Sequence, residues 1–331
     1  MRAALITRYG SADAIQIAEV AKPTPQPGEV LVKVHATTVN RTDCGELVPG
    51  LVGRLLLYGF WKPRRAIFGL DVAGVVEQVG TGVTRFRVCD RVFGLCPMRR
   101  NGAHAEYVCI PESGPITTLP ACIAFDQAIV CEGAYYASAM MTQPSVGPGT
   151  HILVYGASGA IGSAAVQLAK DRGAEVTAAV QARHLDLARS LGADHVVDCA
   201  SDEFAQPGQR FDIVYDSVGK MPIRQWRRLR KPGGIFATTD IGPWGQNLLA
   251  WLGALAMRSK RVIIPLPKRS NIPAFLAELR DRMADGTYRA VIDRTYRLDQ
   301  IADAYRYVAT GQKAGIVLIV VAESSTEEAL T

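Results

Sequence analysis

The stretch Tyr155-Gly156-Ala157-Ser158-Gly159-Ala160-Ile161-Gly162-Ser163 decides the fold that we predict for this chain of 331 residues. It follows the apolar run Ile152–Tyr155, typical of a buried strand, and precedes a helical pattern at Ala164–Lys170. In such a unit the glycines let the backbone approach a pyrophosphate, and the helix N-terminus offers free N–H groups and partial positive charge. We therefore predict dinucleotide binding by the turn residues Gly156, Ala157, Ser158, Gly159, Ala160, Ile161 and Gly162.

Short strands alternate with helices after this turn. We expect strands at Glu175–Val180, His195–Val197, Phe211–Tyr215, Gly234–Thr239 and Arg261–Ile264, with helices at Arg183–Leu191 and near Arg224. The alternation predicts an α/β fold with a doubly wound parallel sheet, which binds ligands at the carboxyl ends of its strands. The residues expected near the cofactor at the fourth and fifth strand ends are Ser217, Val218, Gly219, Thr238, Thr239 and Asp240.

The end of the second strand indicates which dinucleotide binds. An NAD site usually has Asp or Glu there to bind the ribose 2′-OH, but this chain has Val180-Gln181-Ala182-Arg183-His184. No carboxylate repels a 2′-phosphate, and Arg183 can pair with it. We therefore assign Gln181 and Arg183 to the cofactor site and predict NADP(H). The alternative is that Arg183 is an exposed residue at the start of a helix and that selectivity is slight.

The remainder of the chain is β-rich at the start and mixed at the end. Val30–Thr37 alternates apolar and polar residues after a proline-rich entry, and the β-branched runs Val72–Val79 and Arg91–Phe93 extend the pattern to a small barrel. The segment Leu47–Phe68 is either a lid or a packed insertion, and packing is favoured. The C-terminal pattern comprises helices at Ile272–Ala284 and Asp299–Thr310 and extended runs at Ala290–Tyr296 and Gly315–Val321, followed by a polar tail, Glu323–Thr331, expected to fray.

Composition excludes several classes of protein. Hydrophobic residues are 48% and charged residues 21%, which suits a globular chain with its own core, and the net charge is +6. The seven cysteines are odd in number and contain no CxxC pair, so we expect no disulfide framework and a reducing compartment. No apolar run is long enough for a signal peptide or a membrane span, which predicts a cytoplasmic protein without a membrane partner. The basic cluster between Arg224 and Lys231 is interpreted as a solvated helix face, so nucleic acid is not an expected partner.

No metal site is predicted. Structural zinc needs closely spaced thiolates, and the spacing of Cys89, Cys96 and Cys109 does not fit. Cys44 and Cys131 are isolated in sequence and are interpreted as small buried apolar residues.

Several motifs together resemble those of the zinc-independent quinone oxidoreductases, the ζ-crystallin-like branch of the medium-chain dehydrogenase/reductases. Besides the glycine turn they are Pro27–Val34, Val39–Asp43, Gly69–Val76, Gly102–Tyr107, Gln167–Lys170, Leu191–Asp194 and Asp216–Gly219. The resemblance runs from Met1 to about Val321. It implies a GroES-like β-rich catalytic domain in residues 1–121 and 265–331, with an inserted Rossmann NADP-binding domain in residues 122–264. It also implies a homodimer.

The resemblance agrees with the absence of a predicted metal. Asn40 stands where the zinc enzymes carry a ligand Cys, and Leu70 replaces the His of their Gly-His-Glu motif. Other departures are Cys89 where the family commonly has Gly, and Gly45 where some members have Tyr. The usual Gly-Lys near the C-terminus is Gly315-Ile316 here, so a cofactor role for a terminal lysine falls to Lys313.

The activity that the resemblance implies is hydride transfer from NADPH to a quinone or an α,β-unsaturated carbonyl. The implied catalytic residues are Asn40, Asp43 and Tyr135. Asn40 holds the carbonyl oxygen or the nicotinamide ribose, or is a turn residue after a strand. Asp43 orients Asn40 or a water, or caps a helix. Tyr135 or its neighbour Tyr136 donates a proton, or both pack in the core, and Glu132 and Cys131 beside them are further possibilities.

Two other functions stay open at this point. One is an NAD(P)-dependent alcohol dehydrogenase, which the loss of a zinc ligand at Leu70 disfavours. The other is a non-catalytic NADPH- or RNA-binding protein, supported only by the net charge and the basic cluster. Trp244, in the loop Ile241–Asn247, is expected either to stack on a flat acceptor or to anchor an oligomer.

Overall fold

The computed structural model describes residues 1–322 except 51–53, 55–57, 98–101, 143–145, 202–203, 205–207, 241, 243–244, 260 and 266–270. The predictions for the tail and for Trp244 therefore lie outside the described residues. The chain divides into two compact units. The first comprises Met1–Glu132, Leu276–Ala284 and the chain from Ile292 onward, and the second comprises Gly133–Phe275 and Asp285–Val291.

The first unit is built on a seven-stranded sheet with the order β14-β15-β3-β4-β5-β7, in which β6 pairs with β3. A separate hairpin-like pair, β1 and β2, lies outside this sheet. The strands of the unit are β1 Arg2–Ile6, β2 Ile15–Glu19, β3 Glu29–Val39, β4 Asp71–Val79, β5 Arg91–Leu95, β6 Tyr107–Pro111, β7 Ile116–Thr118, β14 Ile292–Arg297 and β15 Ile316–Val320. Because β15 runs antiparallel to β3, with Val317 opposite Val39, the C-terminal segment is part of this sheet.

The predicted strand over Val30–Thr37 is part of β3, which is buried on both faces although its sequence alternates apolar and polar residues. Only Lys33 of its eleven residues is not fully buried. The polar members find partners inside the unit: the ring of His35 stacks on Phe125 at 4.5 Å, and Thr37 donates a hydrogen bond to the backbone of Asp71. Internal partners let polar residues occupy a buried strand, so the polar positions of the pattern did not mark a solvent face.

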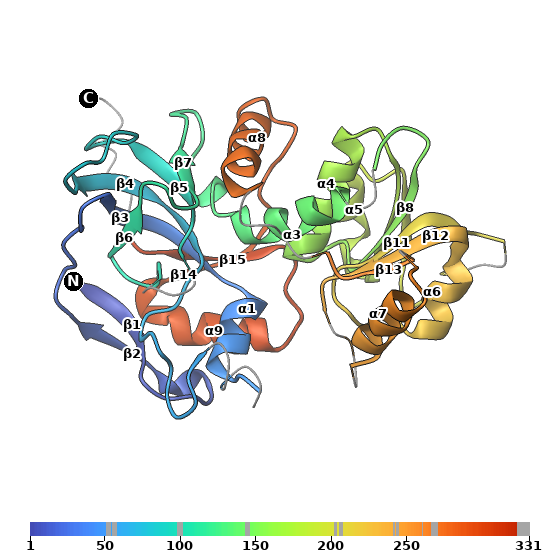
Figure 1. Ribbon diagram of the computed structural model, residues 1–331, viewed down its shortest axis with the longest axis horizontal. Coiled ribbons are helices and arrows are strands. Elements are labelled where there is room, and N and C mark those ends of the chain that lie inside the picture. The colour runs from blue at the N-terminus through green and yellow to red at the C-terminus, as the bar shows by residue number, and fades with distance from the viewer. Residues whose placement is uncertain are drawn as a thin grey trace. The chain divides into compact units, whose positions relative to one another are not determined.

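Three helices belong wholly or mainly to this unit. They are α1 Arg41–Leu47, α9 Ile301–Ala309 and most of α8 Ile272–Ala284. The buried residues of α9, Ile301, Ala304, Tyr305 and Val308, recur at helical spacing and join the main core, and Figure 1 shows α9 beside α1. Burying each large apolar side chain contributes about 1.5–3 kcal/mol.

The second unit is a six-stranded, entirely parallel sheet with the order β10-β9-β8-β11-β12-β13. Its strands are β8 His151–Tyr155, β9 Glu175–Val180, β10 His195–Asp198, β11 Phe211–Asp216, β12 Arg230–Thr238 and β13 Val262–Ile263. The helices are α3 Cys131–Thr142, which starts in the first unit, α4 Ala160–Asp171, α5 Leu185–Ser190, α6 Ile223–Leu229 and α7 Gln246–Ala256. The predicted doubly wound parallel sheet is confirmed, with α4 and α5 on one face and α6 and α7 on the other (Figure 1).

The strand order reverses between β8 and β11. In sheets of this type the reversal opens a crevice at the carboxyl ends of the two strands, and ligands bind there. The glycine turn follows β8 and the residues Ser217–Gly219 follow β11, so the fold brings both predicted cofactor segments to this position.

The helix α7 was not predicted. Its sequence, Gln246–Ala256, is apolar on all sides and contains no charged residue, so it lacks the periodic contrast that identifies a surface helix. No helix in the described part of the chain combines the length and the apolar character that crossing a bilayer requires.

Candidate functional site

The glycine turn of the second unit is held against the neighbouring strand. The N–H groups of Gly156 and Ala157 both donate to the carbonyl of Ala179 in β9, at 2.9 and 3.2 Å. Gly156 has φ +78°, in the left-handed region that favours glycine. The helix α4 begins directly after Gly159, whose missing side chain leaves the helix without a side-chain cap. The first-turn N–H groups of α4 are therefore available to an anion.

The two later glycines of the turn meet different surroundings. A Cβ on Gly162 would lie 2.2 Å from the carbonyl oxygen of Gly156, so the chain's own packing excludes any side chain there. A Cβ on Gly159 would meet nothing nearer than that same oxygen, at 3.5 Å. Space thus remains in front of the helix terminus, and the turn fits the pyrophosphate of a dinucleotide.

The segments after β11 and β12 lie beside this turn. The hydroxyl of Ser217 donates to the carbonyl of Tyr155 at 2.8 Å, and that of Thr239 donates to the carbonyl of Ser217 at 3.3 Å. A Cβ on Gly219 would lie 2.2 Å from the Cβ of Asp240, so these two segments touch. The structure therefore brings together the residues predicted at the three strand ends.

A buried carboxylate shapes the middle segment. Asp216 accepts backbone N–H bonds from Val218, Gly219 and Met221 at 3.1, 2.8 and 2.8 Å. Burial raises the pKa of Asp216, and these bonds partly offset the increase. Its role is to fold the loop that the cofactor segments share.

Gln181 and Arg183 follow β9 as predicted, at a short 3₁₀ turn over Ala182–His184. Both side chains are exposed, and the Nε of Arg183 lies 3.1 Å from the Nε2 of His184. The structure therefore places an exposed guanidinium at the end of β9.

The first unit contains a buried acid cluster centred on Asp71. One oxygen of Asp71 accepts bonds from the hydroxyl of Thr38 at 2.8 Å and the amide Nδ2 of Asn40 at 3.2 Å, and the other accepts the backbone N–H of Glu132 at 2.9 Å. The same Asn40 Nδ2 also donates to the hydroxyl oxygen of Thr38 at 2.8 Å. Both amide hydrogens of Asn40 are thus directed at neighbours inside the unit.

Asp43 belongs to the same cluster. Its carboxylate accepts the backbone N–H of Asn40 at 2.8 Å and forms part of a capping box at the start of α1. The helix cap and the orientation of Asn40, which the sequence left as alternatives, are therefore one and the same contact. Burial, together with repulsion between the carboxylates, raises the pKa values of Asp43, Asp71 and Glu132 to about 7.

Glu132 completes the cluster at the beginning of α3. The hydroxyl of Thr42 donates to its Oε1, and the Asn40 side chain lowers its pKa through a hydrogen bond. Sequence reasoning mentioned Glu132 only in passing and did not single out Thr38, Thr42 or Asp71. The available signal was the concentration of polar residues at the carboxyl end of the strand and just after it, at Thr37, Thr38 and Asn40.

The remaining predicted residues lie elsewhere. Tyr135, on α3, belongs to the second unit, and its ring lies 5.2 Å from that of Phe275. Lys313 belongs to the first unit, where its Nζ donates to the carbonyl of Gly315 at 2.6 Å. Burial lowers the pKa of Lys313, although Glu132 and Asp293 act in the opposite direction.

Within the described residues no three His, Cys, Asp or Glu side chains are grouped so as to hold a metal ion. Leu70 is buried, and the nearby His104 is taken up by other contacts: its Nε2 lies 2.8 Å from the carbonyl of Thr38 and its Nδ1 lies 3.4 Å from the hydroxyl of Tyr305. Burial lowers the pKa of His104 to about 4, so it is neutral at physiological pH.

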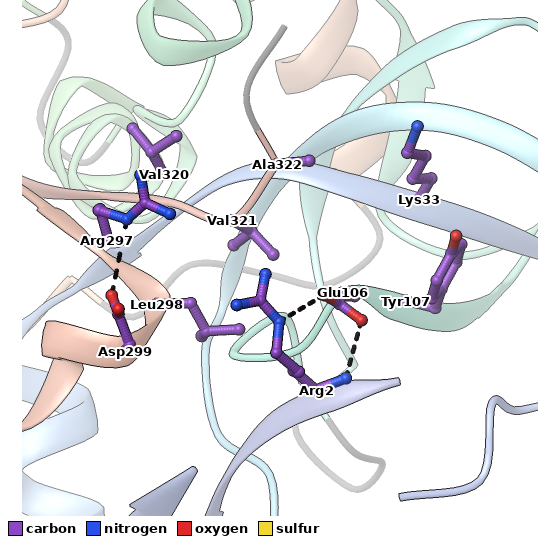
Figure 2. A pocket seen from close by; sticks show the side chains of 10 residues that line it. All are labelled: Arg2, Lys33, Glu106, Tyr107, Arg297, Leu298, Asp299, Val320, Val321 and Ala322. Carbon is purple, nitrogen blue, oxygen red and sulfur yellow. Dashed lines mark hydrogen bonds and ion pairs between the residues drawn. The ribbon is translucent and has the colours of Figure 1, made fainter. Parts of the chain in front are cut away.

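Two surface hollows lie away from these residues. A hollow of about 390 Å³ in the first unit is lined by charged side chains that already pair, Arg2 with Glu106 at 2.8 Å and Arg297 with Asp299 at 3.8 Å (Figure 2). A larger groove of about 830 Å³ in the second unit runs along β12, β13 and α7, where Arg227 and Arg230 both contact the ring of Trp226. Neither contains a predicted cofactor or catalytic residue.

The sequence and the fold of this chain are similar to those of known proteins. Residues 26–121 match the family model of the alcohol dehydrogenase GroES-like domain, and residues 191–319 match that of zinc-binding dehydrogenases. The chain is 32% identical to the chloroplastic quinone-oxidoreductase homolog of Spinacia oleracea, over 94% of this chain and 95% of that protein. It is 28% identical to the 2-methylene-furan-3-one reductase of Solanum lycopersicum, over 96% and 79%. The quinone oxidoreductase from Coxiella burnetii has the same fold, with a TM-score of 0.85, 23% identity and coverage of 97% and 99%.

Proposed function

Because the chain belongs to the quinone oxidoreductase branch of the medium-chain dehydrogenase/reductase superfamily, a family of nicotinamide-dependent oxidoreductases, we propose that it reduces a conjugated carbonyl compound with NADPH and without a metal. The observation that carries the proposal is the buried acid cluster of the first unit. Asn40, which stands where the family resemblance implies a ligand Cys in the zinc enzymes, forms hydrogen bonds with Asp71 and Glu132 instead.

The names of the relatives support the class of acceptor. One relative is named a quinone-oxidoreductase homolog and another a 2-methylene-furan-3-one reductase. A quinone and an enone share a carbonyl conjugated to a carbon–carbon double bond, and both accept a hydride and a proton. We propose a quinone or an α,β-unsaturated carbonyl as the substrate of this chain.

NADPH, and not NADH, is the proposed cofactor. Its pyrophosphate would bind at the turn Gly156–Gly162, with Ser217–Gly219, Thr239 and Asp240 beside it. Its 2′-phosphate would pair with Arg183, next to Gln181, at a strand end without a carboxylate of its own. Lys313 is a further proposed contact. Apart from Lys313, the cofactor contacts of this assignment lie in residues 122–264, and residues 1–121 and 265–331 bind the substrate.

The cofactor supplies the hydride when it is bound. The chain must stabilise the negative charge that develops on the substrate oxygen and provide a proton. Asn40 is a positioning residue in this scheme, since both its amide hydrogens are engaged and its Oδ1 is buried. Asp43 holds the backbone of Asn40 in place, and Tyr135 acts from the cofactor-binding unit.

The proposal includes a homodimer in a reducing, cytoplasmic setting. Helix α7 and the residue just after it expose five large apolar side chains next to the edge strand β13: Leu248, Leu249, Leu252, Leu255 and Met257. An exposed apolar patch beside an unpaired strand edge is typical of an association surface. All seven cysteines are free thiols, which suits a reducing compartment.

The test is an assay of the purified protein after treatment with EDTA. Loss of nicotinamide absorbance is followed with quinones, enals and simple alkanals, with NADPH and NADH in parallel. Turnover of quinones or enals with NADPH that EDTA leaves unchanged is the expected result. Turnover of alkanals alone, abolished by EDTA, would instead indicate a metal-dependent alcohol dehydrogenase, and NADPH binding without any turnover would leave a binding protein.

A further inference from the structure

Two carboxyl oxygens of the acid cluster are buried without a hydrogen-bond donor, Oδ1 of Asp43 and Oε2 of Glu132. A buried acceptor without a donor costs about 1–3 kcal/mol. A proton on Glu132 removes one of the three neighbouring carboxylate charges, and on Oε1 that proton faces the hydroxyl of Thr42.

The other carboxyl oxygen of Glu132 contacts a residue that is only partly buried. Its Oε1 contacts the hydroxyl of Thr42, the one member of this hydrogen-bonded chain that is only partly buried. A hydroxyl can accept a hydrogen bond on one side and donate one on the other. The buried acid is therefore a single hydroxyl away from the surface of the first unit.

We propose that Glu132 supplies, through the hydroxyl of Thr42, the proton that the reduced substrate takes up. The inference rests on the proposed reductase function and adds to it the route of the proton. Thr42 would contact the substrate oxygen, and Glu132 would act through Thr42.

The β-carbon of an enone takes the hydride of NADPH, the carbon–carbon π bond breaks, and its electron pair moves toward the oxygen. That oxygen takes the proton of Thr42 while Thr42 takes the proton of Glu132. The products are NADP⁺, an enol that becomes the saturated carbonyl, and the Glu132 carboxylate, which regains a proton from water through Thr42. A quinone becomes a quinol by the same count of two electrons and two hydrogens.

The charges around Glu132 suit a proton held at neutral pH. Asp43 at the start of α1 and Asp71 at the start of β4 repel its charge, while Lys313 before β15 attracts it. Cys44 on α1 is a neutral neighbour, because burial raises the pKa of its thiol to about 12. Burial is the largest influence on Glu132, and the pKa of about 7 lets it release and regain a proton near neutral pH.

The first test compares Glu132→Gln with the wild type, using a quinone or enone that the wild type reduces. The amide keeps the shape but carries no transferable proton, so kcat should fall by about 100-fold. The alkaline limb of the pH–rate profile should disappear, and the Kd for NADPH should stay unchanged. The matched control is Glu106→Gln, a carboxylate paired with Arg2 on the surface (Figure 2), which should keep wild-type kinetics.

Thr42 provides a test that does not depend on the folding of the Glu132 variant. Thr42→Ser keeps the hydroxyl and should retain most of the activity, whereas Thr42→Val should lose activity about as far as Glu132→Gln does. Wild-type kcat and an unchanged pH profile in both Glu132→Gln and Thr42→Val would overturn the proposal. Failure of the wild type to reduce any quinone or enone would instead overturn the proposed function.

A spectroscopic measurement tests whether Glu132 holds a proton, and it does not require that the protein turn over a substrate. Infrared difference spectra of the wild type between pH 6 and pH 9 should contain the C=O band of a protonated carboxylic acid. That band should be weaker in Glu132→Gln, where only Asp43 and Asp71 still contribute to it, and unchanged in Glu106→Gln. A band identical in wild type and Glu132→Gln would show that Glu132 holds no proton and would contradict the inference.

Discussion

The glycine turn of the second unit and the acid cluster of the first unit are built on opposite principles. Over the seven residues Gly156–Gly162, the turn offers backbone N–H groups and the space that missing glycine side chains leave. The cluster uses side chains of Thr38, Asn40, Asp71 and Glu132, which come from three separate parts of the chain. Backbone sites tolerate little change in residue size, whereas side-chain clusters tolerate little change in charge or hydrogen bonding. The comparison therefore predicts different failures for the two regions.

The largest effect should come from removing the centre of the cluster. Asp71→Ala leaves the hydroxyl of Thr38, the amide of Asn40 and the N–H of Glu132 without their acceptor, and should lower the free energy of unfolding by about 3–5 kcal/mol. Urea denaturation measures this change. Asp299→Ala, an exposed pair with Arg297, is the control and should change it by less than about 0.5 kcal/mol. Equal losses in both variants would contradict the cluster's role in holding the first unit together.

The glycine turn should be sensitive to the size of the side chain at each glycine position. Gly162→Ala places a Cβ 2.2 Å from the oxygen of Gly156 and should cost about 2–3 kcal/mol of stability, together with NADPH binding. Gly159→Ala meets open space, so its stability should change by less than about 1 kcal/mol while the Kd for NADPH rises about tenfold or more. Urea denaturation and fluorescence titration with NADPH separate the two outcomes. Wild-type binding by Gly159→Ala would mean that the pyrophosphate does not lie at this turn.

The cluster should respond to pH in a way that the turn does not. The pKa of Glu132 is raised from 4.5 to about 7 in the folded protein, so between these values the unfolded chain ionises first. Wild-type stability from this group is complete below pH 4.5 and is lost as pH rises to about 7. Relative to Glu132→Gln, the wild type should therefore lose on the order of 2 kcal/mol between pH 5 and pH 8. A constant difference between the two proteins across this range would contradict the raised pKa.

A smaller effect is expected on the preference for NADPH over NADH, which we assign to Arg183 in the second unit. Replacing Arg183 by Ala should reduce the preference for NADPH over NADH about tenfold, because one charge-assisted contact with the 2′-phosphate is lost. The ratio of kcat/KM values for the two cofactors measures it. Arg189→Ala, on the next helix and paired with Asp186, is a suitable control and should leave the ratio unchanged.

The smallest effect concerns a turn in the first unit. Cys89 has φ +72°, a conformation that glycine adopts without strain, which agrees with the family's glycine at this position. Cys89→Gly should raise the free energy of unfolding by about 1 kcal/mol. Thermal unfolding checks the sign, and a loss of stability would mean that the Cys89 side chain contributes packing that outweighs the strain.

The glycine turn and the acid cluster also differ in how well the sequence predicts them. The turn was predictable because its residues are consecutive and its chemistry depends on glycine positions between a strand and a helix. The cluster was only partly predictable, because Asn40 and Asp71 are 31 residues apart and Thr42 and Glu132 are 90 apart, and a pattern along the chain does not show which residues meet. Asn40 and Asp43 were identified through the family resemblance, yet their contacts with Asp71 and Glu132 required the fold. Helix α7 was missed because an apolar helix has no polar face to reveal its period.

The central claim is that this chain moves a hydride from NADPH to a conjugated carbonyl without a metal. The most direct measurement uses NADPH deuterated at both C4 positions, EDTA-treated protein and an enone in ordinary water, with the product examined by NMR. We predict one deuterium on the β-carbon and ordinary hydrogen from water on the α-carbon. Consumption of NADPH with no deuterium in the product, or a reaction that occurs only after metal is restored, would contradict the account.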